Sequence, residues 1–215
     1  MEIKACLFDL DGVIVDTAKY HYIAWKELAK ELGFDFTETD NERLKGVSRM
    51  ASLEILLGIG GISLPEDKKN ELAARKNERY VSYITQMKPD EILPGAREFL
   101  WELRHHGILT ALGSASKNAM TILDRLELSD LFDAIIDGNK ATKAKPDPQV
   151  FLMGAQVLAC HPNQCVVFED AEAGIEAAIA ANMRCVGIGS TATLGKANLV
   201  VDGLHCMNLD KLKTL

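Results

Sequence analysis

The sequence lacks the features that mark secreted, membrane-bound and zinc-binding proteins. No apolar stretch approaches the roughly 18 residues of a membrane-spanning helix, and Met1 leads into a strand-like run with no basic segment before it. The five cysteines are odd in number, scattered, and without Cys or His partners at zinc spacing, so we expect buried free thiols. The expected protein is cytoplasmic and has no membrane partner.

Positive charge is also in short supply. The chain of 215 residues has 24 Lys and Arg against 31 Asp and Glu, a net charge of −7, which argues against a broad face for nucleic acid. Its 47% hydrophobic and 26% charged content is that of an ordinary globular protein, with a monomer as the default state. A small molecule is the expected partner. If that molecule is anionic, a cation or a few basic residues must offset the acidic background locally.

The pattern along the chain predicts two regions of different architecture. Residues 3–10 have the apolar, strand-forming composition of a buried parallel strand, and acidic residues and Gly12 mark where it ends. Residues 16–88 show helical periodicity without a strand, whereas residues 89–215 alternate helix and strand. This alternation is typical of a doubly wound parallel α/β sheet. We therefore expect an α/β core of residues 1–15 and 89–215 with an inserted helical cap domain of residues 16–88.

The individual elements follow from the same periodicities. Further strands are predicted at residues 109–112, 134–136, 165–168 and 185–188. Helices are predicted at residues 18–32, 40–44, 50–57, 65–87, 96–106, 119–126, 148–158 and 171–181.

Polar residues that could take part in catalysis or metal binding follow the predicted strands, at the point where each strand ends. These residues are Asp9, Asp11, Ser114, Lys145, Glu169 and Asp170. In an open parallel sheet the ligand binds outside the carboxyl ends of the strands, so we expect these side chains to converge. Four carboxylates at one edge repel one another unless a divalent cation lies among them, and oxygen-only ligands suit Mg²⁺.

Such a group of residues suits phosphoryl transfer. One carboxylate attacks phosphorus and forms an aspartyl phosphate, while Mg²⁺, Lys145 and the Ser114 hydroxyl offset the charge on the transferring group. Each residue also has a structural interpretation: a turn or cap for the aspartates, a helix cap for Ser114, a solvated loop for Lys145, and complementation of a helix dipole for the Glu169 and Asp170 pair. Their convergence at strand ends favours the functional interpretation.

The same residues lie in four ordered motifs that resemble those of the haloacid dehalogenase superfamily. The motifs are DLDGVIVDT, the Ser in ALGSAS, the Lys in AKPDP, and FEDAEAG. The helical insertion after the first motif resembles a subclass I cap. Within the superfamily, the chain resembles the β-phosphoglucomutase family in TAKYHYIAWKELA, LKGVSR, ARKNERYV and GSASKN. Small departures are Gly113 in place of an alanine, and Met50 and Ala51 in place of polar residues.

The resemblance implies a role for each matching residue. Asp9 is expected to be the nucleophile and Asp11 the general acid and base, and Thr17 is expected at the hinge between core and cap. The implied magnesium ligands are Asp9, Asp11, Glu169 and Asp170, with Ser114 and Lys145 balancing charge. The positions implied to bind the sugar bisphosphate are Thr17, His21, Trp25, Gly46, Val47, Ser48, Arg49, Ser52, Lys76, Ala115, Ser116, Lys117 and Asn118. By pattern alone, His21 also fits a helix surface, Trp25 a core and Arg49 a solvated helix start.

The implied activity interconverts β-D-glucose 1-phosphate and D-glucose 6-phosphate through an aspartyl phosphate and β-glucose 1,6-bisphosphate. The main alternative is a phosphatase of the same superfamily, acting on a sugar phosphate or phosphoglycolate with water as acceptor. A C–P bond hydrolase needs a Schiff-base lysine in the cap, for which Lys76 is the candidate. A silent binding module of the phosphate-receiver kind predicts a gap in the motif set, and no motif is missing.

Overall fold

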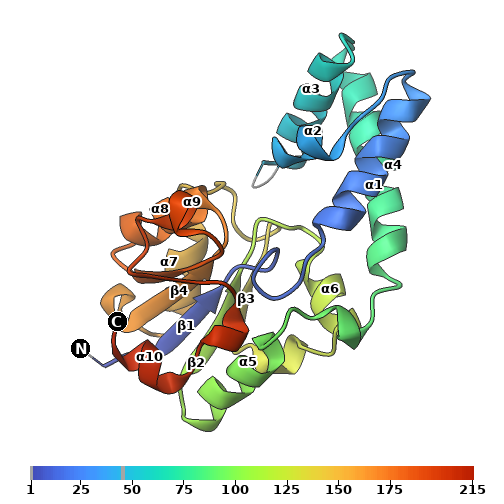
Figure 1. Ribbon diagram of the computed structural model, residues 1–215. Coiled ribbons are helices and arrows are strands. Elements are labelled where there is room, and N and C mark those ends of the chain that lie inside the picture. The colour runs from blue at the N-terminus through green and yellow to red at the C-terminus, as the bar shows by residue number, and fades with distance from the viewer. Residues whose placement is uncertain (1, 45–46) are drawn as a thin grey trace. The chain divides into compact units, whose positions relative to one another are not determined.

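The computed structural model describes residues 2–44 and 47–215. Gly46, one of the predicted substrate contacts, lies outside the described residues. The chain divides into two compact units (Figure 1): the first comprises the N-terminal part up to Asp16 together with Lys88–Leu215, and the second is Thr17–Met87. No helix in the described part of the chain combines the length and the apolar character needed to cross a membrane.

The first unit is built on a parallel sheet. Its strands are β1 (Ala5–Phe8), β2 (Leu109–Gly113), β3 (Ala134–Ile136), β4 (Cys165–Glu169), β5 (Arg184–Ile188) and β6 (Leu199–Val201). In the described residues they lie in the order β3-β2-β1-β4-β5-β6, and every neighbouring pair is parallel. This order confirms the predicted doubly wound α/β fold. The edge strand β6 was not predicted because three half-buried residues carry too little pattern.

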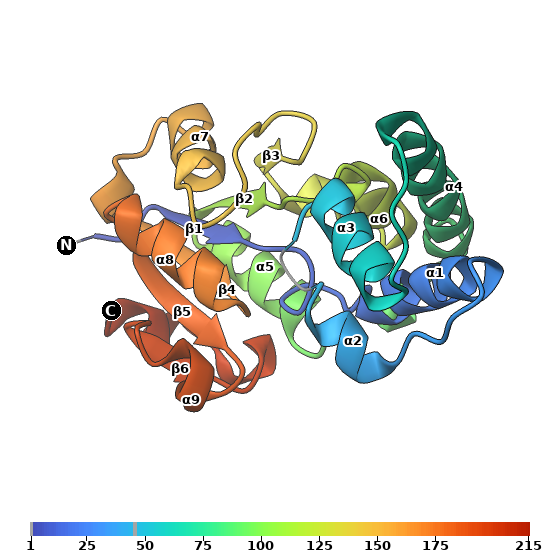
Figure 2. The ribbon, with the colours of Figure 1, turned by 90° about the horizontal axis from the view of Figure 1, so that it is seen from above.

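Helices cover both faces of this sheet. They are α5 (Ala96–His105), α6 (Ala119–Arg125), α7 (Gln149–Val157), α8 (Glu172–Ala180), α9 (Thr191–Leu194) and α10 (Leu209–Lys213). Four 3₁₀ turns are described as well: η1 (Pro89–Glu91), η2 (Ser129–Leu131), η3 (Pro162–Gln164) and η4 (Leu204–Cys206). Figure 2 shows α7 and α8 on one side of the sheet and α5 on the other.

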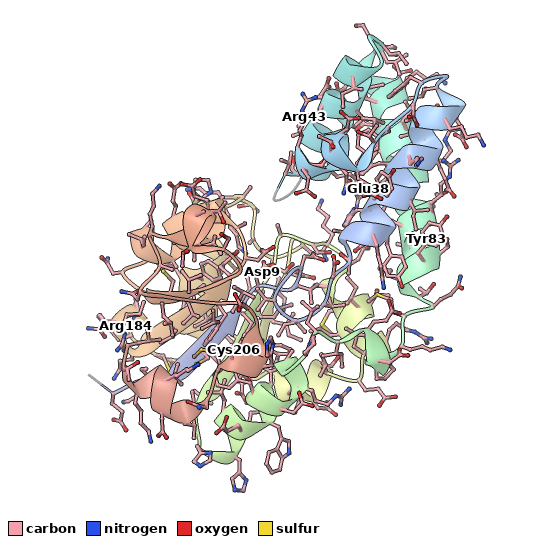
Figure 3. All side chains as sticks on the ribbon, viewed as in Figure 1. Asp9, Glu38, Arg43, Tyr83, Arg184 and Cys206 are labelled. Carbon is pink, nitrogen blue, oxygen red and sulfur yellow. The ribbon has the colours of Figure 1, made fainter. Side chains whose placement is uncertain are left out.

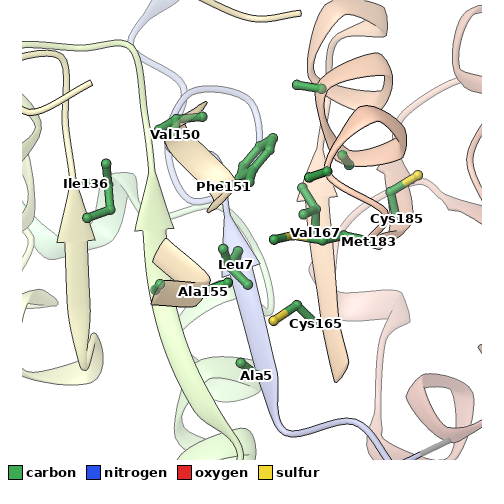
Figure 4. Close-up of a cluster of buried hydrophobic side chains, with 14 of the residues drawn as sticks. Ala5, Leu7, Ile136, Val150, Phe151, Ala155, Cys165, Val167, Met183 and Cys185 are labelled. Atoms are coloured by element: carbon green, nitrogen blue, oxygen red, sulfur yellow. The ribbon is translucent and has the colours of Figure 1, made fainter. Parts of the chain in front are cut away.

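Side chains that alternate along each strand supply both layers of the core. Leu7 on β1 and Val167 on β4 pack with Phe151 of α7 in a buried apolar cluster (Figure 4). Their neighbours Phe8 and Phe168 point to the other face, where the two rings stack with centroids 4.6 Å apart. Both central strands are therefore buried on both sides, as their continuous apolar composition predicts.

The strand order fixes where a ligand site is expected. β1 lies between β2 and β4, with Phe8 in register with Leu112 on one side and Phe168 on the other. The chain order reverses between β1 and β4, which makes this the switch point of the doubly wound sheet. The residues immediately beyond these strand ends are therefore the first candidates for chemistry.

The second unit contains helices and, in its described residues, no strand. The helices are α1 (Ala18–Glu31), α2 (Glu38–Glu42), α3 (Arg49–Ile59) and α4 (Glu66–Ile84). Thr37 and Asp40 form a capping box at the start of α2, and the Ser48 hydroxyl accepts a hydrogen bond from the Ala51 N–H at the start of α3. Trp25, Leu28 and Phe36 belong to the apolar core of this unit.

Candidate active site

Three carboxylates gather at the carboxyl ends of β1 and β4. Asp9 directly follows β1 and donates its N–H to the Phe168 carbonyl at 2.9 Å, which continues the ladder by one residue. Glu169 is the last residue of β4, and Asp170 follows it. One oxygen from each carboxylate lies within 4.8 Å of the other two. Asp9, labelled in Figure 3 at the tip of β1, is 9% exposed, and Glu169 is 1% exposed.

Lys145 supplies the adjacent positive charge. Its Nζ donates to Asp9 Oδ1 at 2.5 Å and to Glu169 Oε1, and lies 4.9 Å from the centre of the Phe151 ring. Burial lowers the pKa of this ammonium, but the charges of Asp9 and Glu169 outweigh it, so the pKa lies above its ordinary value. Lys145 is therefore a cation at neutral pH. The fold brings it to Asp9 although the two residues are 136 positions apart in the chain.

One lysine does not balance three carboxylates. Burial, and then the charge of Asp9, raise the pKa of Glu169 to about 7, although Lys145 opposes the shift. Burial and the charges of Asp9, Glu169 and Asp11 raise the pKa of Asp170 to about 8. Ionising all three carboxylates in this poorly solvated place is therefore unfavourable without further positive charge, which is the electrostatic condition for binding a cation.

Two motif glycines make room for these carboxylates. Gly12 adopts φ +77°, and a Cβ there would lie 2.2 Å from Asp170 Oδ2. A Cβ on Gly174 would lie 1.9 Å from the carboxyl carbon of Glu169. Only glycine therefore fits at either position without displacing a carboxylate. Together with the oxygen-only donor set and the buried charge, these positions fit a divalent cation.

Asp11 lies outside the group of three in the described residues. Its charge nevertheless contributes to the raised pKa of Asp170, so it is near enough to act on the cluster electrostatically. The role of Asp11 as a metal ligand stays a prediction.

Ser114 begins a loop that follows β2. Its N–H donates to the Ile136 carbonyl at 2.9 Å, and its hydroxyl accepts from the Ser116 N–H at 3.1 Å. Further along the loop, the Asn118 N–H donates to Ser116 Oγ at 3.2 Å, at the start of α6. The structure also explains Gly113, since a Cβ there would lie 2.9 Å from the Phe151 ring.

The second unit holds a buried group of basic and aromatic side chains. Lys76 on α4 is 3% exposed, and its Nζ lies 2.7 Å from His21 Nδ1 and 4.4 Å from the centre of the Trp25 ring. The His21 ring stacks on Tyr80 at 4.0 Å, and the Tyr80 hydroxyl donates to Thr17 Oγ1 at 3.2 Å. The structure thus brings four of the predicted residues together.

The basic groups Lys76, His21 and Arg49 lie close enough to shift one another's pKa values. Burial, and then the charge of Arg49, lower the pKa of Lys76 to about 7. Burial followed by the charges of Lys76 and Arg49 lower the pKa of His21 well below its ordinary value. His21 is therefore neutral at pH 7 and accepts the hydrogen bond at Nδ1 when Lys76 is protonated.

Arg49 begins α3 and donates through Nη2 to Asn77 Oδ1 at 2.8 Å. Burial lowers the pKa of its guanidinium. Next to it, Ser52 is buried and its hydroxyl lies 3.5 Å from the Val47 carbonyl, while Ser48 caps the helix.

Sequence reasoning missed Tyr80 and Asn77, which hold His21 and Arg49 in place. A signal was present for Tyr80, because it lies four residues after Lys76 and therefore on the same face of α4. Asn77 has no comparable local signal, since its partner is 28 residues away.

Comparison with known proteins places this geometry in context. Residues 3–182 match the family described as haloacid dehalogenase-like hydrolase. The chain is 43% identical over 212 residues to a β-phosphoglucomutase of Bacillus subtilis, covering 98% of this chain and 94% of that protein. A crystal structure of β-phosphoglucomutase from Clostridium difficile superimposes with a TM-score of 0.93 at 45% identity, over 99% of this chain and 96% of that one.

A phosphatase is also among the relatives. The fructose-1-phosphate phosphatase YqaB of Escherichia coli is 31% identical over 184 residues, covering 85% of this chain and 94% of that protein. The matches confirm the superfamily that the four motifs predicted, and they agree with the narrower resemblance read from the cap and the Ser114 loop.

Proposed function

The chain belongs to the haloacid dehalogenase-like hydrolase family, and on that premise we propose that it is a β-phosphoglucomutase. It interconverts β-D-glucose 1-phosphate and D-glucose 6-phosphate through β-glucose 1,6-bisphosphate. The observation that carries the choice of a mutase is the 43% identity over 98% of the chain, which includes the helical unit as well as the sheet. The buried charges of both units support it.

In the proposed reaction, an oxygen of the Asp9 carboxylate attacks phosphorus and forms an aspartyl phosphate as the bond from phosphorus to the sugar oxygen breaks. Lys145 holds the attacking carboxylate through the 2.5 Å hydrogen bond and offsets charge on the phosphoryl oxygens. The Ser114 hydroxyl contributes a further donor. Asp9, Asp11, Glu169 and Asp170 are the proposed ligands of Mg²⁺, which supplies electrostatic stabilisation of the phosphoryl group when bound.

Asp11 is the proposed general acid and base. It protonates the sugar oxygen that leaves phosphorus, and it removes the proton from the sugar hydroxyl that later attacks the aspartyl phosphate. The bisphosphate formed in this way turns round and returns its other phosphate to Asp9. Each cycle therefore regenerates the phosphoenzyme, with no net transfer to water.

A mutase must bind a phosphate at each end of one sugar. We assign the second phosphate to Arg49, whose planar guanidinium suits a phosphate, and to Ser116, Lys117 and Asn118 at the start of α6. The remaining predicted cap contacts are assigned to the sugar. Burial and the charge of Arg49 disfavour the protonated form of Lys76, and an anionic ligand would relieve this, which supports such a ligand for this unit.

One experiment separates the mutase from the phosphatase. The enzyme is incubated with Mg²⁺, β-glucose 1-phosphate and a trace of the bisphosphate, and glucose 6-phosphate is followed against free phosphate. A mutase gives glucose 6-phosphate with little free phosphate. Stoichiometric release of phosphate would replace the proposal with a sugar-phosphate phosphatase, the activity that the Escherichia coli relative represents.

A further inference from the structure

We propose that Asn139, together with Gly138, is a positioning residue that fixes the shape of the loop Ser114–Asn118, which we call the phosphate loop. The inference rests on the proposed function, because that function assigns the second phosphate to this loop. It concerns a turn after β3 for which no role was predicted, and the phosphate loop itself follows β2.

The turn is anchored by a buried carboxylate. Asp137 directly follows β3, is 5% exposed, and has no ion-pair partner among the described residues. It instead accepts hydrogen bonds from the Asn139 N–H at 3.0 Å, the Asn139 side-chain amide at 2.9 Å and the Lys140 N–H at 3.2 Å. A buried carboxylate with several N–H donors is a well-defined anchor, so the turn has one preferred geometry.

From this anchor, Gly138 and Asn139 donate hydrogen bonds to two backbone carbonyls of the phosphate loop. The Gly138 N–H donates to the Ser116 carbonyl at 3.1 Å, and the Asn139 side-chain amide donates to the Lys117 carbonyl at 2.9 Å. The two segments are so close that a Cβ on Gly138 would lie 2.2 Å from the Ala115 carbonyl oxygen. Asn139 thus joins the buried Asp137 to the phosphate loop through the two hydrogens of a single amide.

Holding these carbonyls also sets the direction of the amides in the phosphate loop. In a trans peptide the C=O and the following N–H point in opposite directions. The hydrogen bond from the Gly138 N–H to the Ser116 carbonyl therefore directs the Lys117 N–H away from Gly138. Among the described residues this N–H has no acceptor. The hydrogen bond from the Asn139 amide to the Lys117 carbonyl likewise directs the Asn118 N–H, which donates to Ser116 Oγ. The turn prepares the loop to donate to phosphate oxygens before substrate arrives.

The chain offers a matched control in the adjacent residue. Lys140 also makes a hydrogen bond from its side chain to a backbone carbonyl, that of Ile135 at 2.6 Å, but this carbonyl belongs to β3 and not to the phosphate loop. Both side chains are exposed, so replacing either one leaves the buried core intact. A merely structural role for the turn predicts the same modest effect from both replacements.

The test compares Asn139→Ala and Asn139→Asp with Lys140→Ala. Asp keeps the size of the side chain but has no amide hydrogens for the Lys117 carbonyl. We expect the KM for β-glucose 1-phosphate to rise about 5- to 10-fold in both Asn139 variants, as for loss of a hydrogen bond in a preorganised site. Phosphoenzyme formation from acetyl phosphate, which has no second phosphate, should stay within about 2-fold of wild type. Lys140→Ala should match wild type in both assays.

Equal KM values for the Asn139 variants and Lys140→Ala would overturn the inference, and so would an equal loss in the acetyl phosphate assay. Failure of the proposed function is distinguishable, because it shows in the wild-type enzyme as free phosphate without glucose 6-phosphate. Thermal midpoints of all variants, measured alongside, identify any variant that is poorly folded. A variant with a lowered midpoint is then assayed at a temperature where it is fully folded.

Discussion

The two units of the chain bury charge of opposite sign. In the sheet unit, Asp9, Glu169 and Asp170 outnumber Lys145, and the pKa values of Glu169 and Asp170 are raised. In the helical unit, Lys76 and Arg49 are partly or wholly buried, and the pKa of each is lowered. Each cluster contains groups that destabilise one another in the absence of an opposite charge.

The comparison indicates the sign of the charge that each unit is suited to bind. Surplus carboxylates at the end of a parallel sheet call for a cation, and surplus ammonium and guanidinium groups call for an anion. A sugar phosphate with Mg²⁺ supplies both, which is why the charge pattern and the proposed reaction agree. Neither cluster is explained by folding stability alone, since burying like charges costs free energy.

The largest expected effect comes from removing the nucleophile of the sheet unit. Asp9→Asn should abolish turnover and phosphoenzyme formation, leaving less than about 1% of activity, because an amide is a far poorer nucleophile than a carboxylate. Single-turnover assays with acetyl phosphate measure this directly. Asp90→Asn, the same change at an exposed carboxylate of the same unit, should have no effect. Activity above about 1% in Asp9→Asn would remove Asp9 from the nucleophile role.

Removing the cation should have an effect almost as large but reversible. EDTA should silence the enzyme, since the carboxylates around Asp9 then lack their counter-charge, and Mg²⁺ should restore activity. Ca²⁺ should substitute poorly, because its longer and looser coordination misplaces the phosphoryl group. Mutase rates in buffer freed of metal, with each ion added back, give the comparison. Full activity without metal would contradict the divalent site.

An intermediate effect is expected from the cationic cluster. Arg49→Ala should lower mutase kcat/KM by roughly 30- to 1,000-fold, or about 2 to 4 kcal/mol, because a charge-assisted contact to the second phosphate is lost. Hydrolysis of acetyl phosphate should hardly change. Arg43→Ala is the control, since Arg43 is exposed in the same unit (Figure 3). An equal fall in both reactions would assign Arg49 to the structure of the unit, and no fall in either would favour the phosphatase.

The sheet unit was the more predictable from sequence. Parallel strands bring their carboxyl ends to one edge, so Asp9, Lys145 and Glu169 were predicted together although they are far apart in the chain. Periodicity also located the predicted helices to within a few residues, whereas the short helices α9 and α10 were not predicted. In the helical unit, for example, the helix predicted at residues 65–87 begins one residue later and ends at Ile84, because Pro65 is the N-cap and Thr85 the C-cap.

The helical unit gave less information. Helical periodicity identifies a buried face but not which residues of two helices meet, so the contact of Lys76 with His21 was not predicted. The family resemblance named the two residues only as separate substrate contacts. Tyr80 and Asn77 were missed for the same reason. In the sheet unit, Asn139 was missed because its partners depend on the packing of two loops, and no local spacing encodes that packing.

The smallest expected effect tests the burial of Lys76 through stability. Its pKa is about 7 when folded against an ordinary value of 10.5, so between these values the unfolded chain holds a proton that the folded chain has released. The free energy of unfolding should therefore rise with pH from about 7 upward, by about 2 kcal/mol between pH 7 and pH 9, and this contribution is lost as the pH falls through 7. Lys76→Met has a side chain of similar length and no charge, so its stability curve should lack this rise, and the variant should be the more stable protein at pH 7. Denaturant midpoints at several pH values provide the measurement.

Lys30→Met makes the same replacement at an exposed lysine of α1 and should keep the wild-type rise. Parallel curves for wild type and Lys76→Met would mean that Lys76 keeps its proton in the folded chain, and the difference in buried charge between the two units would then rest on Arg49 alone.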